Sequence, residues 1–316
     1  MQASTKSGLQ PSGPPNRLAL SAHGRSDVPP IVFPTSPLPA VNVASVAQRS
    51  PLRYPGGKTW LIPHIKNWLT HVTPKPRVLI EPFCGGGIVS LTAVMEKWAD
   101  RCLMLEVDRD VAAFWHAALG HGKALTDKVV QFELTRAGVN ELTSQTPKDV
   151  VEHGFRTLVL NRTRRGGVLA PGAAFTKVGE NGKGLGSRWY PETIANRLQA
   201  IMRCNGQIGF LEGDAMTFLE GLLHMQTGVA VFLDPPYTAG GKNAGKRLYA
   251  HHEIDHSRLF ELMADSGAEF LMTYDESPEI ATLIHKHRFH AVRVMMKNGH
   301  HNQIAELVVT PRVVFA

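Results

Sequence analysis

Short apolar runs that end at a carboxylate restrict the fold of this chain more than any other feature. Three of them are RVLIEPF at 77–83, CLMLEVD at 102–108 and VAVFLD at 229–234. Runs of this length, rich in Val, Ile and Leu, are typical of strands buried on both faces of a parallel sheet. Stretches with helical spacing follow the first two runs, over 88–98 and 110–119. This order of strand and helix predicts an α/β fold in which helices cover both faces of the sheet.

The domain organisation follows from where this alternation pauses and resumes. It pauses over 131–205, where we expect helices and a glycine-rich loop, and it resumes with further strand-like runs such as EFLMTYD and AELVVT. We therefore predict one α/β domain, formed by residues 49–130 and 206–316 and interrupted by a helical, basic insertion over 131–205. Residues 1–48 hold eight of the 21 prolines and a single acid. Because such a composition buries little apolar surface, we expect a disordered tail there.

The net charge of +7 is concentrated in the predicted insertion. Nine Lys or Arg residues and two acids lie between Arg156 and Arg203, a difference of +7 that equals the excess of the whole chain. A localised positive surface favours a polyanionic partner such as nucleic acid. The alternative is a solvated basic face that serves solubility.

Membrane, secretory and metal-binding classes are disfavoured. No run of about 18 apolar residues is present, so no membrane helix is expected. The N-terminus lacks the apolar core of a secretory signal, which favours the cytoplasm. The three cysteines are widely spaced and fit neither a disulfide framework nor a zinc site. The histidines of HHEIDH (251–256) and the pair His300–His301 match no common zinc spacing, so we expect surface histidines and no metal.

Four acids mark the edge of the predicted sheet where a ligand would bind. Glu81, Asp108, Asp214 and Asp234 each end or closely follow a strand-like run. Because ligands of open parallel sheets lie at the carboxyl ends of the strands, we expect these carboxylates to face one ligand. Asp108 is a candidate to accept hydrogen bonds from both ribose hydroxyls of a nucleoside, and Asp214 is a candidate for its adenine edge. Each could instead cap the following helix, although Asp110 could cap in place of Asp108.

The stretch EPFCGGG (81–87) predicts the chemical class of the ligand. Its three contiguous glycines allow a tight turn and a close approach of the backbone to a ligand, but they do not match the G-x-G-x-x-G of dinucleotide sites. The acid Glu81 disfavours a phosphate and favours a cation. S-adenosylmethionine, which carries a sulfonium and an ammonium and no phosphate, fits this pattern. The alternative is an ordinary turn between a strand and a helix.

The stretch DPPY (234–237) predicts the chemistry. The exocyclic amine of a nucleobase is a poor nucleophile because its lone pair is delocalised into the ring, so catalysis has to hold the nitrogen between acceptors. The Asp234 carboxylate and the Pro235 carbonyl can be these acceptors, while Pro235 and Pro236 fix φ and stiffen the turn. Tyr237 offers a ring on which an extruded base can stack. This arrangement predicts methyl transfer to an amine, with positioning as a main source of the rate.

Several motifs, in a fixed order, resemble the Dam-like (alpha-group) adenine-N6 DNA methyltransferases. They are RYPGGK (53–58), EPFCGGG, LEVDRD, DPPY, LMTYDES and the terminal NQIAELVVT, and the resemblance spans residues 49–316. It implies a Rossmann-like methyltransferase fold, S-adenosylmethionine as the methyl donor and adenine N6 in double-stranded DNA as the acceptor. It places the donor at Tyr54, Gly57, Lys58, Glu81, Phe83, Gly85, Gly87, Asp108 and Asp214, and the target base at Asp234, Pro235, Pro236 and Tyr237.

The resemblance also implies that the insertion recognises DNA. LNRTRRGG (160–167) is similar to the Leu-Asn-Arg stretch that opens the recognition region of the family. The chain then departs into a glycine-rich loop, so the recognition sequence cannot be carried over. GKNAGKRLY (241–249) is a candidate lid that orders when the target base arrives. The candidate DNA contacts are Asn161, Arg162, Arg164, Arg165, Lys177, Lys183 and Arg188.

The sequence leaves several alternatives open. DPPY alone does not separate adenine-N6 from cytosine-N4 in DNA or from adenine in RNA, since all three present a conjugated amine. A DNA-binding module that has lost catalysis is a further alternative, against which the intact DPPY weighs. We expect a monomer or weak dimer in a bacterial or phage-encoded setting, associated with the nucleoid through DNA, and restriction-modification is one candidate role.

Overall fold

The computed structural model describes residues 38–54, 56–179, 182–222, 228–236, 254–297 and 303–315. They all belong to one compact unit, Val32–Ala316. Several predictions fall outside the described residues: most of the tail 1–48, the ring of Tyr237, the candidate lid 241–249 and the histidines at 251, 252, 300 and 301.

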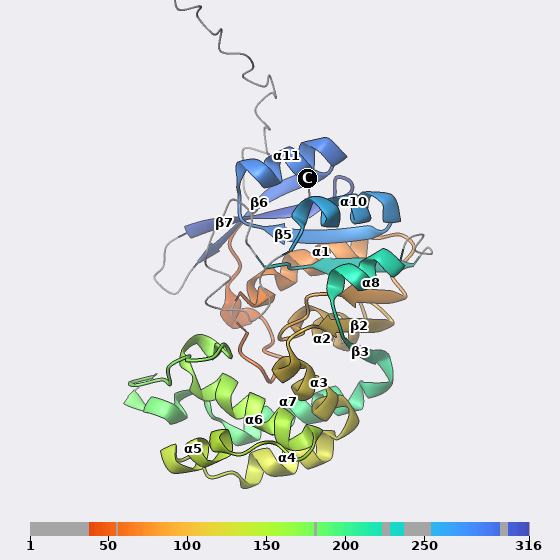
Figure 1. Ribbon diagram of the computed structural model, residues 1–316. Helices are drawn as coiled ribbons and strands as arrows, with labels where there is room; N and C mark the ends of the chain where they lie inside the picture. The colour runs from red at the N-terminus through yellow and green to blue at the C-terminus, as the bar shows by residue number, and fades with distance from the viewer. Residues whose placement is uncertain are drawn as a thin grey trace, which may run out of the picture. The chain divides into compact units, whose positions relative to one another are not determined.

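Seven strands of the described chain form one sheet in the order β3-β2-β1-β4-β5-β7-β6 (Figure 1). Strands β1 to β5 are parallel to one another, whereas β7 runs antiparallel to both β5 and β6. The predicted α/β, Rossmann-like sheet is confirmed, with an antiparallel strand added. The strands are β1 (Val78–Glu81), β2 (Arg101–Glu106), β3 (Ile208–Glu212), β4 (Val229–Leu233), β5 (Glu269–Tyr274), β6 (His290–Lys297) and β7 (Gln303–Thr310).

The direction of β7 follows from the short connection before it. Residues 298–302 are all that separates β6 from β7, whereas a parallel crossover needs about a dozen residues or more. The chain therefore turns back and inserts β7 between its neighbours, where Val308 pairs with Thr273 of β5 and with Val292 of β6. This insertion carries the middle of β7 toward the centre of the sheet.

Helices cover both faces because the chain moves in opposite directions along the sheet. Strands β1 to β3 succeed one another toward one edge and β4 and β5 toward the other, and right-handed crossovers then put the connecting helices on opposite faces. Helix α1 packs on α2, and α10 packs on both α8 and α11. The first group is α1 (Ile62–His71) and α2 (Ile88–Met95), and the second is α8 (Ala215–Gly221), α10 (His256–Ser266) and α11 (Pro278–His287). Helix α3 (Arg109–Gly120) follows β2.

The described part of the chain between α3 and β3 contains four α-helices. They are α4 (Gly122–Gln131), α5 (Arg136–Ser144), α6 (Val150–Thr163) and α7 (Pro191–Arg203), and we call them the helical segment. Helix α6 packs along α3, and α7 packs along α4, so the segment gathers beside α3 (Figure 1). Its buried contacts include Phe155, Leu158 and Leu198. The borders predicted for the insertion, 131 and 205, stay a prediction.

Candidate active site

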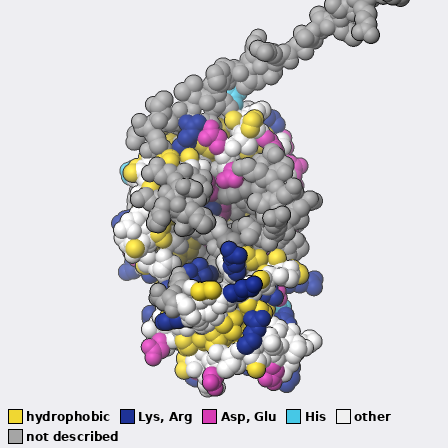
Figure 2. Space-filling model, turned by 90° about the vertical axis from the view of Figure 1, so that its left-hand side faces the viewer, with side chains coloured by type: hydrophobic (Ala, Val, Ile, Leu, Met, Phe, Trp, Pro, Cys, Tyr) yellow, Lys and Arg dark blue, Asp and Glu magenta, His cyan; other side chains and the backbone are white. Residues whose placement is uncertain are grey.

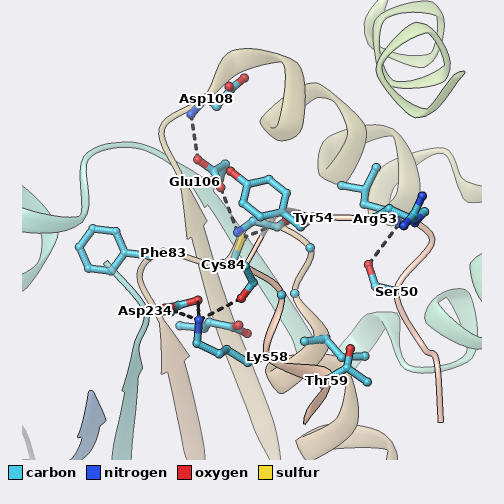
Figure 3. A pocket seen from close by; sticks show the side chains of 18 of the residues that line it. Ser50, Arg53, Tyr54, Lys58, Thr59, Phe83, Cys84, Glu106, Asp108 and Asp234 are labelled. Atoms are coloured by element: carbon cyan, nitrogen blue, oxygen red, sulfur yellow. Dashed lines mark hydrogen bonds and ion pairs between the residues drawn. The ribbon is translucent and has the colours of Figure 1, made fainter. Parts of the chain in front are cut away.

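A cavity of about 710 Å³ opens at the carboxyl edge of the sheet, between the parallel neighbours β1 and β4. After β1 the chain continues to β2 on one side, and after β4 it continues to β5 on the other side. Such a switch point is where ligands of open α/β sheets bind. Figure 3 shows Tyr54 beside Glu106, with the Lys58–Asp234 pair on one side of Tyr54 and Arg53 on the other. The residues predicted for the donor and the target base that line the cavity are Tyr54, Gly57, Lys58, Glu81, Phe83, Gly85, Gly87, Asp108, Asp214, Asp234, Pro235 and Pro236.

The glycine loop after β1 is shaped by its packing as well as by its backbone. Gly85 and Gly87 have φ of 45° and 61°, in the left-handed region that favours glycine. A Cβ on Gly85 would lie 2.5 Å from the ring of Tyr54, and one on Gly87 would lie 2.8 Å from the ring of Trp115. The loop therefore leaves no room for side chains at these two positions, and Gly87 caps the start of α2.

Glu81 ends β1 and is almost completely buried, with 3% of its side chain surface exposed. Its Oε2 accepts a hydrogen bond of 2.8 Å from the backbone N–H of Ser90 in α2. Burial raises the pKa of Glu81 to about 8; the hydrogen bonds of Ser90 oppose this shift and the charge of Asp234 adds to it. A cation placed in the cavity would favour the ionised form of this carboxyl.

Glu106, which the sequence analysis did not single out, is the pocket carboxylate at the end of β2. Its Oε2 accepts from the N–H of Gly85 (3.0 Å), and its Oε1 accepts from the N–H groups of Val107 and Asp108 (3.0 Å each). Burial raises the pKa of Glu106 to about 7 against these hydrogen bonds. The signal was present, since the apolar run CLML ends directly at Glu106.

Asp108 lies at the cavity but caps a helix. Its Oδ1 accepts from the N–H of Asp110 (2.9 Å) and of Val111 (3.3 Å), at the start of α3. The alternative in which Asp110 caps this helix is therefore wrong. Asp214 likewise caps α8, accepting from Thr217 N at 2.8 Å, so the predicted nucleoside contacts of Asp108 and Asp214 stay predictions.

Asp234 follows β4 and forms an ion pair with Lys58. The Lys58 Nζ lies 2.8 Å from both carboxylate oxygens, and the Thr273 hydroxyl donates to Oδ1 at 2.8 Å. Lys58 is 3% exposed and also lies 3.3 Å from Glu306 Oε1. Burial by itself lowers the pKa of Lys58, but the charges of Asp234 and Glu306 outweigh burial and leave that pKa above its ordinary value. Lys58, predicted to bind the donor, thus contacts the candidate catalytic acid.

Asn161 and Arg162, two of the predicted DNA contacts, are turned inward. Asn161 is fully buried; it accepts from Arg53 N (2.7 Å) and donates to Arg53 O (2.8 Å) and Gly167 O (2.9 Å). Arg162 Nε donates to Pro51 O at 2.7 Å. A DNA strand cannot reach Asn161 in this conformation, because α6 uses this side chain to hold the 50–54 stretch. In this conformation Asn161 and Arg162 therefore hold the 50–54 stretch, and their contacts with DNA stay predictions.

Positive charge gathers at the cavity wall beside this clamp. Arg53, Arg162, Arg188 and Arg197 all line the cavity, and Arg197 Nη1 donates to Ser50 O at 2.8 Å. Burial and these three positive neighbours lower the pKa of Arg162 to about 9. The cavity therefore has an acidic end at the strand termini and a basic end at the helical segment.

The remaining basic candidates differ in exposure. Arg164 is partly buried and donates to Leu169 O at 2.8 Å, which ties the loop to the end of α6. Arg165, Lys177 and Lys183 are exposed, and Lys183 lies 5.6 Å above the ring of Tyr190. Figure 2 shows Lys and Arg side chains clustered across the middle of one face of the molecule.

The structure also bears on the expected surface histidines, membrane helices and metal ligands. His256 is buried and its Nδ1 lies 3.1 Å from the hydroxyl of Tyr274, so the surface location expected for it is wrong; as the first residue of α10 it faces β5. No helix in the described ranges is long and apolar enough to cross a membrane. Within those ranges no three His, Cys, Asp or Glu side chains are grouped as metal ligands.

The fold and the lining of the cavity agree with the class that the resemblance implies. A Rossmann-like sheet that carries a glycine loop after β1, a carboxylate at the end of β2 and Asp-Pro-Pro after β4 is the arrangement expected of an amino-methyltransferase. Residues 54–142 match the family model of the D12 class N6 adenine-specific DNA methyltransferases. This match, over that segment, supports the resemblance that the motifs indicated.

Comparisons over most of the chain give further similarities. The chain is 26% identical over 261 residues to the DNA N-6-adenine-methyltransferase of Escherichia phage P1; the alignment covers 79% of this chain and 33% of that protein. The chain therefore spans about a third of the length of this curated relative. Similar solved structures include a putative RNA methyltransferase from Pyrococcus horikoshii (9% identity, TM-score 0.39, covering 86% of this chain and 95% of that one). An rRNA methyltransferase from Streptomyces viridochromogenes is also similar (15% identity, TM-score 0.38, covering 81% and 85%).

Proposed function

We propose that this protein transfers a methyl group from S-adenosylmethionine to the N6 amine of an adenine extruded from double-stranded DNA. The observation that carries the proposal is the position of Asp234: its carboxylate opens into the same cavity as the glycine loop and Glu106. The matched family and the phage relative favour adenine in DNA over the other conjugated amines.

The acidic end of the cavity suits S-adenosylmethionine. Its volume of about 710 Å³ lies within the range of small-molecule sites, roughly 300–1,000 Å³. Glu81 and Glu106 are buried acids whose pKa values are raised, and a sulfonium or an ammonium in the cavity would favour their ionised forms. S-adenosylmethionine, when bound, supplies an electrophilic methyl group. We propose that Glu106 accepts from the ribose hydroxyls and that Glu81 favours the cationic part.

The Asp-Pro-Pro corner is proposed to hold the target amine. Asp234 and the carbonyl of Pro235 accept its two N–H groups, and the prolines keep both oxygens aimed because their φ angles are fixed. A nitrogen held this way meets the donor in line, and positioning supplies much of the rate. Asp234 then takes the surplus proton of the methylated amine. Tyr237 is proposed to stack on the base.

The basic residues are proposed to hold the DNA backbone. Phosphate contacts fix the orientation of a duplex without reading its sequence, and Arg165, Lys177 and Lys183 are exposed in the connection between α6 and α7. Arg188 and Arg197 lie at the basic end of the cavity. We propose that this end holds the strand from which the base is extruded.

A labelling experiment tests the proposed function. The protein is incubated with methyl-labelled S-adenosylmethionine and with unmodified duplex DNA or RNA, and the product is digested to nucleosides. Label in N6-methyladenosine of the deoxy series, absent with the Asp234→Ala variant, is the expected result. Label in N4-methylcytosine or in RNA would assign one of the alternative substrates. DNA binding without any transfer would indicate a binding module.

A further inference from the structure

Glu306 is a buried carboxylate behind the active site; it lies within the motif NQIAELVVT, but the sequence analysis assigned it no role. It lies in β7 and is 2% exposed, and it does not line the cavity. In the sequence it interrupts the apolar run IAELVVT. The antiparallel insertion of β7 between β5 and β6 brings it to 3.3 Å from the Nζ of Lys58.

The contacts of Asp234 raise a problem for the proposed reaction. Its two oxygens already face the Lys58 ammonium, at 2.8 Å each, and Oδ1 also accepts from Thr273. A target amine has to be held by the same carboxylate. The ammonium therefore competes with the substrate for the acceptor, and it cannot simply give up its partner, since a buried charge without one is costly.

Glu306 solves this problem by its position. The Lys58 ammonium lies between two carboxylates and also donates to Gly56 O at 2.9 Å. A lysine side chain is a flexible stem with three donors, so a small displacement moves its charge from one carboxylate toward the other. One cation and two carboxylates leave a net charge of −1, which is retained beside a cationic donor after such a move.

We propose that Glu306 is a positioning residue: it receives the Lys58 ammonium when the target amine arrives, and so releases Asp234 to hold that amine. This inference rests on the proposed function. Glu306 acts through Lys58 and does not touch the substrate.

The variant Glu306→Gln tests the proposal because it keeps the size of the side chain and removes the charge that Lys58 needs. Single-turnover methyl transfer should slow by about tenfold or more, the order expected when a reacting group is misplaced. The dissociation constants of S-adenosylmethionine and DNA should change by less than about threefold, because Glu306 lies outside the cavity. The matched control is Glu269→Gln, which removes a carboxylate of β5 that is paired with Arg312 at 2.7 Å.

A structure of the complex with S-adenosylhomocysteine and DNA gives a second measurement that does not depend on folding of a variant. The proposal is supported if Lys58 Nζ lies within hydrogen-bonding distance of Glu306 and no longer contacts Asp234. Lys58 still paired with Asp234 beside a bound base overturns it, as does a Glu306→Gln enzyme that transfers at the wild-type rate. A wild-type protein that methylates no nucleic acid would instead remove the proposed function itself.

Discussion

The buried acid Glu81 should make the stability of the ligand-free protein depend on pH. Its pKa is about 8 in the folded state, whereas the ordinary pKa of a glutamate, which applies to the unfolded chain, is 4.5. Between these values the unfolded chain has lost the proton and the folded chain keeps it. The folded state therefore binds more protons, and the free energy of unfolding falls as the pH rises from about 4.5 to 8.

The size of this effect follows from the shift. Each pKa unit corresponds to about 1.4 kcal/mol, so 3.5 units would amount to about 5 kcal/mol across the whole window, and to roughly 3.5 kcal/mol between pH 5 and pH 8. This change is a large fraction of the free energy of unfolding of a typical domain, which is about 5–15 kcal/mol. The contribution is fully present below the unfolded pKa and is lost by the folded pKa.

Urea unfolding at several pH values between 5 and 8.5, without donor, measures this contribution. In Glu81→Gln the amide oxygen can still accept from Ser90 N, but no proton is exchanged. The free energy of unfolding of the variant, relative to that of the wild type, should therefore increase by roughly 3.5 kcal/mol as the pH rises from 5 to 8. The exposed Glu220 on α8 provides the control variant Glu220→Gln. Parallel pH profiles for wild type and Glu81→Gln would refute the reasoning, because Glu81 would then ionise alike in both states.

Three further predictions concern the site. Gly85→Ala should destabilise the protein by about 1–3 kcal/mol in urea unfolding, because φ is positive and the added Cβ meets the ring packed on the loop; an unchanged midpoint would contradict the geometry. Glu106→Ala should weaken donor binding in calorimetry by more than Asp108→Ala, whose main effect should be the loss of a helix cap, about 1 kcal/mol of stability; the reverse order would restore Asp108 as the ribose ligand. Arg165→Gln should reduce the slope of log affinity against log salt by about 0.9 if this exposed side chain contacts one phosphate, and an unaltered slope would remove it from the interface.

Short stretches of the sequence are enough to predict the local structure that they form. Apolar runs of strand length followed by helical spacing predict the α/β order, because periodicity is a local property. Single residues also indicate local backbone geometry: Gly85 and Gly87 allow the positive φ angles found there, and Pro235 and Pro236 fix φ. The identity of the pocket acid on β2 was missed, although the end of the apolar run at Glu106 indicated it.

Contacts between side chains far apart in the sequence, and the burial of particular side chains, depend on how the strands and helices pack together. Lys58 contacts Asp234 across 176 positions of sequence, and Glu306 joins them because β7 inserts between two other strands. Asn161, which a local motif marks as a DNA contact, is buried because α6 packs against the 50–54 stretch. The physical reason is that burial and charge pairing depend on the order of strands in the sheet, and a local pattern carries no information about that order.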